Sequence, residues 1–266
     1  MVLTVLKYLY IRICFYFYKF SGLDYKDLTL TESYKIPIII TSFNQLEYLK
    51  KLIDFLLSRG FSNLVIIDNN STYEPLLRYF DKIEKKVTIH RLKKNYGHLV
   101  FWKKYDLFIK YGNGYYVVTD PDIVPLADCP ADFLIKFQSA LIENKKRMKV
   151  GFGLKIDDIP LSNPNREKVI NWESKFWKKK ISEGVFDADI DTTFALYKPF
   201  YHRKNKKFKT ALRTDYPYVA LHGGWYIDMD NLSEEQLFYF KTANDSSSWK
   251  IDETGKIANA DYEKKY

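Results

Sequence analysis

Short runs of apolar residues recur along the first half of the chain, and each run stops at a cluster of polar residues. The runs cover residues 36–40, 64–67, 87–90 and 115–119. Continuous apolar runs of this length are typical of strands that are covered on both faces. Amphipathic segments lie between them, so the pattern predicts an α/β fold with a mostly parallel central sheet flanked by helices.

Helix signals accompany these strands. Asn44 precedes Glu47 by three residues, which predicts a helix that is capped by Asn44 and closed by Gly60. Ser233 and Gln236 form the same capping pattern near the end of the chain. The remaining elements that we expect are helices at 74–83, after 95–97, at 130–146 and at 169–177, and strands at 150–156 and 192–197. The polar tail, residues 246–266, is expected to fray.

Polar side chains gather where the predicted strands end, and ligands of open α/β sheets bind at that edge. These residues are Thr41, Ser42, Asn44, Asp68, Asn69, Asn95, Asp120 and Asp122. Loops are polar in any case, so the pattern also has a purely structural interpretation. Asp120 and Asp122 are the most specific pair, because two carboxylates one residue apart at a strand end suit Mn²⁺ or Mg²⁺.

Composition and missing motifs exclude several classes. Hydrophobic residues make up 46% and charged residues 28% of the 266 residues, which excludes a disordered chain. No glycine-rich dinucleotide or P-loop motif follows the first strand, and no zinc-protease motif is present. The net charge of +9 favours an anionic partner, but no nucleic-acid-binding module accompanies it.

Four motifs in the same order resemble the GT-A glycosyltransferases of the family 2 type, and they cover about residues 36–126. They lie at residues 38–44, 65–71, 95–97 and 117–122. The resemblance implies a GT-A (Rossmann-like) fold with a nucleotide-binding half at 35–126 and an irregular acceptor half at 127–245. It implies nucleotide contacts from Thr41, Phe43, Asn44, Asp68, Asn95 and Asp120, and a metal held by Asp120 and Asp122.

The second half supplies candidates for the catalytic base and the acceptor site. Asp187, Asp189 and Asp191 precede a predicted strand, where alternation would place them on one face. Asp191 is our first candidate for the base that deprotonates an acceptor hydroxyl, and Asp189 is the second. A solvated turn is the alternative interpretation.

A histidine beside two glycines marks the other candidate segment of the second half. By its similarity to late metal-binding histidines of GT-A enzymes, His222 is the candidate third metal ligand; a structural histidine is the alternative. Trp225 and Tyr226 are candidates for stacking on a sugar or acceptor ring, or for the core.

The amino-terminal segment, residues 1–34, is basic and aromatic. Lys7, Arg12 and Lys19 interrupt its apolar residues, which fits a helix that lies on an anionic membrane surface. A first helix packed on the domain, with its charges turned outward, fits equally well. The basic loop at 202–207 would suit a lipid diphosphate or an acidic membrane face, although most such loops are only solvated.

These observations lead to one hypothesis and two alternatives. The hypothesis is a metal-dependent glycosyltransferase of the hexosyltransferase type, inverting by resemblance. It would transfer a sugar from a nucleotide-diphosphate donor, first UDP, to a glycan or lipid-linked glycan in surface polysaccharide synthesis, in the cytoplasm or peripherally on the membrane. The alternatives are a sugar nucleotidyltransferase, which the missing glycine-rich loop disfavours, and a non-catalytic binding protein.

Overall fold

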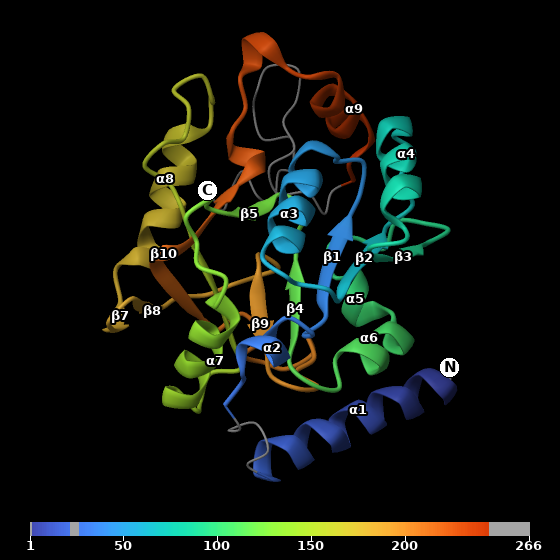
Figure 1. Ribbon diagram of the computed structural model, residues 1–266, viewed down its shortest axis with the longest axis vertical. Coiled ribbons are helices and arrows are strands. Elements are labelled where there is room, and N and C mark those ends of the chain that lie inside the picture. Colours follow the sequence, from blue (N-terminus) through green and yellow to red (C-terminus); the bar gives the residue numbers. More distant parts are fainter. Residues whose placement is uncertain (1, 22–26, 245–266) are drawn as a thin grey trace.

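The computed structural model describes residues 2–21 and 27–244, so the expected polar tail lies outside the described residues (Figure 1). Helices and strands alternate through the first half as predicted. The helices are α1 (Val2–Ser21), α2 (Leu30–Ser33), α3 (Glu47–Ser58), α4 (Glu74–Ile83), α5 (Val100–Lys103), α6 (Tyr105–Tyr111), α7 (Phe133–Glu143), α8 (Arg166–Ser174) and α9 (Glu234–Thr242). The strands are β1 (Ile38–Ser42), β2 (Leu64–Asp68), β3 (Thr88–Arg91), β4 (Tyr116–Thr119), β5 (Ile123–Pro125), β6 (Lys149–Leu154), β7 (Lys180–Ser182), β8 (Val185–Asp187), β9 (Ala195–Tyr197) and β10 (Leu212–His222).

The ten strands of the described residues join one sheet in the order β3-β2-β1-β4-β9-β6-β10-β8-β7, with β5 paired to β10. The strands β3, β2, β1 and β4 are parallel, as the βαβ pattern requires. Strand β9 then lies antiparallel between β4 and β6, while β10 runs parallel to β6. The predicted α/β fold is therefore confirmed, and its second half is mixed.

The continuous apolar strands are explained by helices on both faces of the sheet. Ile38 and Ile40 of β1 face the core that contains α3, α4 and α7. Ile39, between them, faces a second core that contains α5, α6 and the inner side of α1. Because successive side chains of a strand point to opposite faces, both sets must be apolar. In Figure 1 the helix α1 lies along the lower end of the molecule.

The prediction that Asn44 caps α3 is wrong. Helix α3 begins at Glu47, and Asn44 has a positive φ of 50°. Its side-chain oxygen instead accepts hydrogen bonds from the backbone N–H groups of Thr72 and Tyr73, at 2.7 and 3.0 Å. The cap of α3 comes from far along the chain, because the Glu235 carboxylate accepts the N–H groups at the start of this helix, at 2.9 to 3.1 Å.

Smaller differences occur elsewhere. The helix expected after residues 95–97 is divided into α5 and α6, and its Val100, Phe101 and Trp102 are fully buried in the second core. Helix α7 begins at Phe133, later than predicted, and β9 covers only the last part of its predicted range. The helix predicted from Ser233 and Gln236 is confirmed, including both hydrogen bonds of its capping box. None of the helices in the described part of the chain combines the length and the hydrophobicity that a membrane crossing requires.

Candidate functional site

A cavity of about 470 Å³ lies at the carboxyl edge of the parallel strands. The ends of β1 and β4 form its floor, the loop before β9 and the end of β10 form its sides, and α9 contributes a further wall. Most of the site residues predicted from the sequence line it together. They are Thr41, Phe43, Asn95, Asp120, Asp122, Asp189, Asp191, His222 and Trp225.

Strand pairing brings His222 to the acidic motif, from which it is far away in the sequence. Strand β5 follows Asp122 directly and pairs antiparallel with the end of β10, with Ile123 opposite His222. As a result, Nδ1 of His222 lies 3.3 Å from Oδ2 of Asp122. Nδ1 is buried and has no hydrogen-bond partner in the described part of the chain. The two atoms are therefore close enough to contact the same cation.

The glycine pair after His222 allows this close approach. The N–H of Gly223 donates to the carbonyl oxygen of Asp122 at 2.7 Å, and the N–H of Gly224 donates to its carboxylate at 3.1 Å. A Cβ atom on Gly223 would lie 2.4 Å from the ring of Tyr48, which also lines the cavity. A side chain at position 223 would clash with the Tyr48 ring, so a glycine is required there for steric reasons.

Asp120 also lines the cavity and accepts a hydrogen bond from the Thr192 hydroxyl at 2.8 Å. Desolvation raises the pKa of Asp120 well above its usual value, and the nearby charge of Asp122 raises it further. Two carboxylates this close favour a cation between or beside them.

The donor set fits a hard divalent cation. Asp122 and His222 offer two adjacent ligand atoms, and Asp120 adds negative charge. Among the residues that the structure describes, no group of three or more His, Cys, Asp or Glu side chains has metal-binding geometry. Two protein ligands suit Mg²⁺ or Mn²⁺, which commonly complete their coordination with water and substrate phosphates.

Two buried basic side chains, Lys149 and Arg213, hold the loop that carries the two candidate bases. Lys149 donates from Nζ to the carbonyl oxygens of Ile190 and Asp191, at 2.6 and 3.3 Å, and burial lowers its pKa to about 7. Arg213 donates to the carbonyl oxygen of Asp189 at 2.7 and 2.9 Å. These bonds use only backbone oxygens of the loop, so they do not engage the carboxylates of Asp189 and Asp191, and both residues line the cavity.

Asp187 does not belong to this group, contrary to the alternation expected from the sequence. Strand β8 ends at Asp187, so the regular alternation stops there. Its carboxylate forms ion pairs with Arg147 and Lys179 and does not line the cavity. Asp191, in contrast, lies in the cavity with its Oδ2 3.2 Å from Nζ of Lys209.

Three other predicted residues lie outside the cavity lining. Asn44 supports the neighbouring loop, as described above. Asp68 is buried, and its Oδ1 accepts the N–H of Ser71 at 2.9 Å. The hydroxyl of Tyr226 donates to Asp158 at 2.5 Å. These placements favour supporting roles, and the ligand contacts expected of these residues stay predictions.

Several residues that line the cavity are not among those predicted from the sequence. His98 follows the 95–97 motif directly, and its buried Nδ1 has no hydrogen-bond partner among the described residues. Burial lowers the pKa of His98. Its position directly after the motif at residues 95–97 could have indicated that His98 belongs to the site. Lys209 and the α9 residues Glu235 and Tyr239 gave no such signal, since only the tertiary fold brings them to the cavity.

Comparison with solved structures finds distantly similar proteins, among them glycosyltransferases and a UDP-glucose pyrophosphorylase. A Pyrobaculum calidifontis mannosyltransferase, solved with GDP-mannose and Mn²⁺, matches at 14% identity and a TM-score of 0.45, over 78% of this chain and 60% of its own. Residues 1–349 of S. aureus TarS match at 14% identity and a TM-score of 0.44, over 83% of this chain and 67% of their own. GalNAc-T7, solved with UDP, GalNAc and Mn²⁺, matches at 11% identity and a TM-score of 0.44, over 71% of this chain and 43% of its own.

No protein-family model and no curated protein matches the sequence. The solved structures share little identity with this chain, and the chain spans 60% of the mannosyltransferase. At these scores the likeness carries no argument about activity. The functional assignment therefore depends on the cavity and its side chains.

Proposed function

We propose that this protein is a metal-dependent glycosyltransferase that moves a sugar from a nucleotide-diphosphate donor to a hydroxyl group. One observation carries the proposal: Oδ2 of Asp122 and Nδ1 of His222 lie 3.3 Å apart beside Asp120 in a cavity at the carboxyl edge of a parallel sheet. This edge is where open α/β sheets bind nucleotides.

The donor would bind along the ends of β1 and β4. Thr41 and Phe43 line the cavity, and the buried hydroxyl of Thr41 has no hydrogen-bond partner within the described part of the chain. A ligand that reaches Thr41 satisfies this hydroxyl, which explains why it is tolerated there. Asp120 and Asn95 border the same space. The volume of about 470 Å³ matches that of sites for ligands of nucleotide size.

Asp122 and His222 would hold Mn²⁺ or Mg²⁺. When bound, the cation supplies the positive charge that stabilises a diphosphate leaving group. The N–H of Gly224 orients the Asp122 carboxylate, and the pairing of β5 with β10 fixes the position of His222. These contacts set the geometry of the two ligands before any substrate arrives.

Asp191 would act as the base that takes the proton from the acceptor hydroxyl. It faces the cavity, and Lys209 lies beside its carboxylate at 3.2 Å. Lys149 and Arg213 hold the backbone of its loop, which keeps the carboxylate in place. Asp189 is the second candidate. A base opposite the leaving group supports inversion at the anomeric carbon.

The finer assignments follow from the sequence motifs and the surface charge. The donor would be a UDP-sugar first, and the acceptor a glycan or lipid-linked glycan of a surface polysaccharide. Trp225 lines the cavity but is buried in the core, with its ring stacked on His222 at 4.6 Å between ring centroids, which favours the core role; Tyr226 lies outside the lining. We place the reaction on the cytoplasmic side, with residues 35–126 serving the donor and residues 127–245 serving the acceptor.

Replacing one carboxylate of the acidic pair tests the proposal. Asp122→Asn removes a ligand charge with little change in shape, so hydrolysis and transfer of UDP-sugars in Mn²⁺ should fall at least about a hundredfold. Asp54→Asn is the matched control, because Asp54 is exposed on α3 away from the cavity lining. Equal turnover in the two variants would contradict the proposal. Turnover of a nucleoside triphosphate with a sugar phosphate would favour the nucleotidyltransferase instead.

A further inference from the structure

Helix α1 exposes a continuous apolar surface, which we name the outer face. Its residues are between 41% (Tyr16) and 78% (Phe20) exposed. They are Val2, Val5, Leu6, Leu9, Ile13, Tyr16, Phe17 and Phe20. Because successive residues of an α-helix are turned by about 100°, these side chains all lie on the side opposite Ile11 and Phe15. An exposed apolar patch of this kind marks an interaction site.

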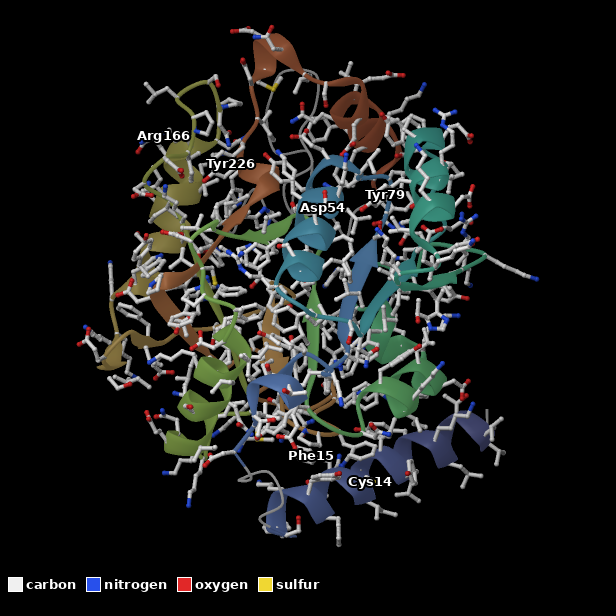
Figure 2. All side chains as sticks on the ribbon, viewed as in Figure 1. Cys14, Phe15, Asp54, Tyr79, Arg166 and Tyr226 are labelled. Carbon is white, nitrogen blue, oxygen red and sulfur yellow. The ribbon has the colours of Figure 1, made fainter. Side chains whose placement is uncertain are left out.

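The inner side of α1 is attached to the body of the protein. Ile11 is fully buried, and Phe15 contacts the ring of Tyr201 at 5.9 Å between centroids. Near the start of the helix, Lys7 forms an ion pair with Asp106 of α6. Figure 2 shows Phe15 directed toward the body, while other side chains of α1 project away from it. These contacts hold α1 on the body of the protein with its outer face exposed to solvent.

The charge around the outer face is positive. Helix α1 contains no acidic residue, and its Arg12 and Lys19 lie together along one edge of the outer face. Other lysines of the body border the helix at both ends. Lys103 and Lys104 share a hollow with the start of α1, Lys145 shares one with Lys19, and Nζ of Lys204 lies 4.1 Å from the centroid of the Tyr8 ring.

We propose that α1 docks the protein on the surface of an anionic bilayer. An apolar helical face with basic residues along its edge and aromatic residues at the boundary is suited to the headgroup region, where the apolar side chains reach the acyl chains. The lysines at both ends of the helix would then meet lipid phosphates and carboxylates. A second copy of the chain fits this face less well, because the cations of two α1 helices would oppose each other with no acidic residue in α1 to pair them.

Docking in this way sets the orientation of the substrate cavity; this consequence depends on the proposed function. Helix α1 packs near the amino end of β4, where the Tyr116 hydroxyl donates to the carbonyl oxygen of Tyr201 at 2.6 Å. The cavity lies at the opposite, carboxyl edge of the sheet. The bilayer and the cavity are therefore at opposite edges, so the acceptor is a glycan end that extends away from the membrane.

Vesicle flotation tests the docking directly. The full chain should float with vesicles of phosphatidylcholine and phosphatidylserine and remain largely free with phosphatidylcholine alone. Leu9→Glu places a charge in the outer face and should lower the partition coefficient at least about tenfold. Arg12→Gln with Lys19→Gln should lower it about fivefold per charge, on the anionic vesicles only.

The matched control is Leu161→Glu, since Leu161 is an 88% exposed leucine that belongs to neither α1 nor the cavity lining. It should float like the wild type. Equal loss in both glutamate variants, or no flotation of the wild type, would overturn the proposal, as would a dimer that only Leu9→Glu dissociates. UDP binding, measured in the same variants without vesicles, should not change, so failure of docking is separable from failure of the transferase assignment.

Discussion

Both ring nitrogens of His202 have hydrogen-bond partners, and this fixes its protonation. Nε2 lies 2.9 Å from the carbonyl oxygen of Trp102, which only an N–H can satisfy. Nδ1 accepts the N–H of Lys204 at 3.2 Å, so it carries no proton. A second proton would break this bond inside a buried aromatic cluster. Burial accordingly lowers the pKa of His202 to about 4.

The lowered pKa of His202 predicts that the folded protein loses stability in acid. The pKa of His202 is about 4 in the folded protein and about 6.5 in the unfolded chain, so the unfolded state binds more protons between these values. The contribution of the neutral ring is complete above pH 6.5 and is lost as the pH falls toward 4, by up to about 1.4 kcal/mol per pH unit. Urea unfolding at neutral pH and at about pH 5 should show a smaller pH effect in His202→Gln. An equal pH effect in both proteins would contradict the assignment.

At the scale of elements, helix α9 connects the end of the described chain to the cavity. Glu235 supplies the cap that the start of α3 lacks, and Asn44 donates to the Thr242 hydroxyl at 2.9 Å. Tyr239 and Phe240 of the same helix line the cavity. Helix α9 therefore both stabilises α3 and forms part of the cavity wall.

Glu235→Ala should weaken both functions of α9. The N–H groups of Leu46 and Glu47 would lose a charged acceptor, which costs about 1–2 kcal/mol of unfolding free energy. Calorimetry should also show weaker UDP binding, because the wall formed by α9 loosens. Glu234→Ala is the control, since Glu234 is exposed and does not line the cavity. Unchanged stability and affinity in Glu235→Ala would show that the cap is energetically unimportant.

Local patterns in the sequence predicted elements well and long-range partners poorly. The apolar runs of β1, β2 and β4 and the capping box at Ser233 depend on neighbouring residues, so they could be recognised. The cap of α3 could not be, because Glu235 comes from the other end of the fold and Asn44 is used elsewhere. The second half was harder to predict because its strands pair in both directions over short lengths.

At the scale of the whole molecule, sheet topology decides which predicted residues meet. The parallel strands place Thr41 and Asp120 at one edge, as the alternating pattern predicted. His222 reaches Asp122 only because the short strand β5 pairs with β10. No local sequence pattern predicts that pairing. The same topology places α1 at the opposite edge from the cavity. The cavity and the outer face of α1 are thus separated.

The most direct test of the account is an anomalous difference map from crystals grown with Mn²⁺ and UDP. We expect one strong manganese peak in contact with Asp122 and His222, with the diphosphate on its open side. In Asp122→Asn crystals the peak should be absent at the same Mn²⁺ concentration. A nucleotide bound in the cavity with manganese elsewhere, or no manganese at all, would contradict the central claim that these two side chains hold the cation.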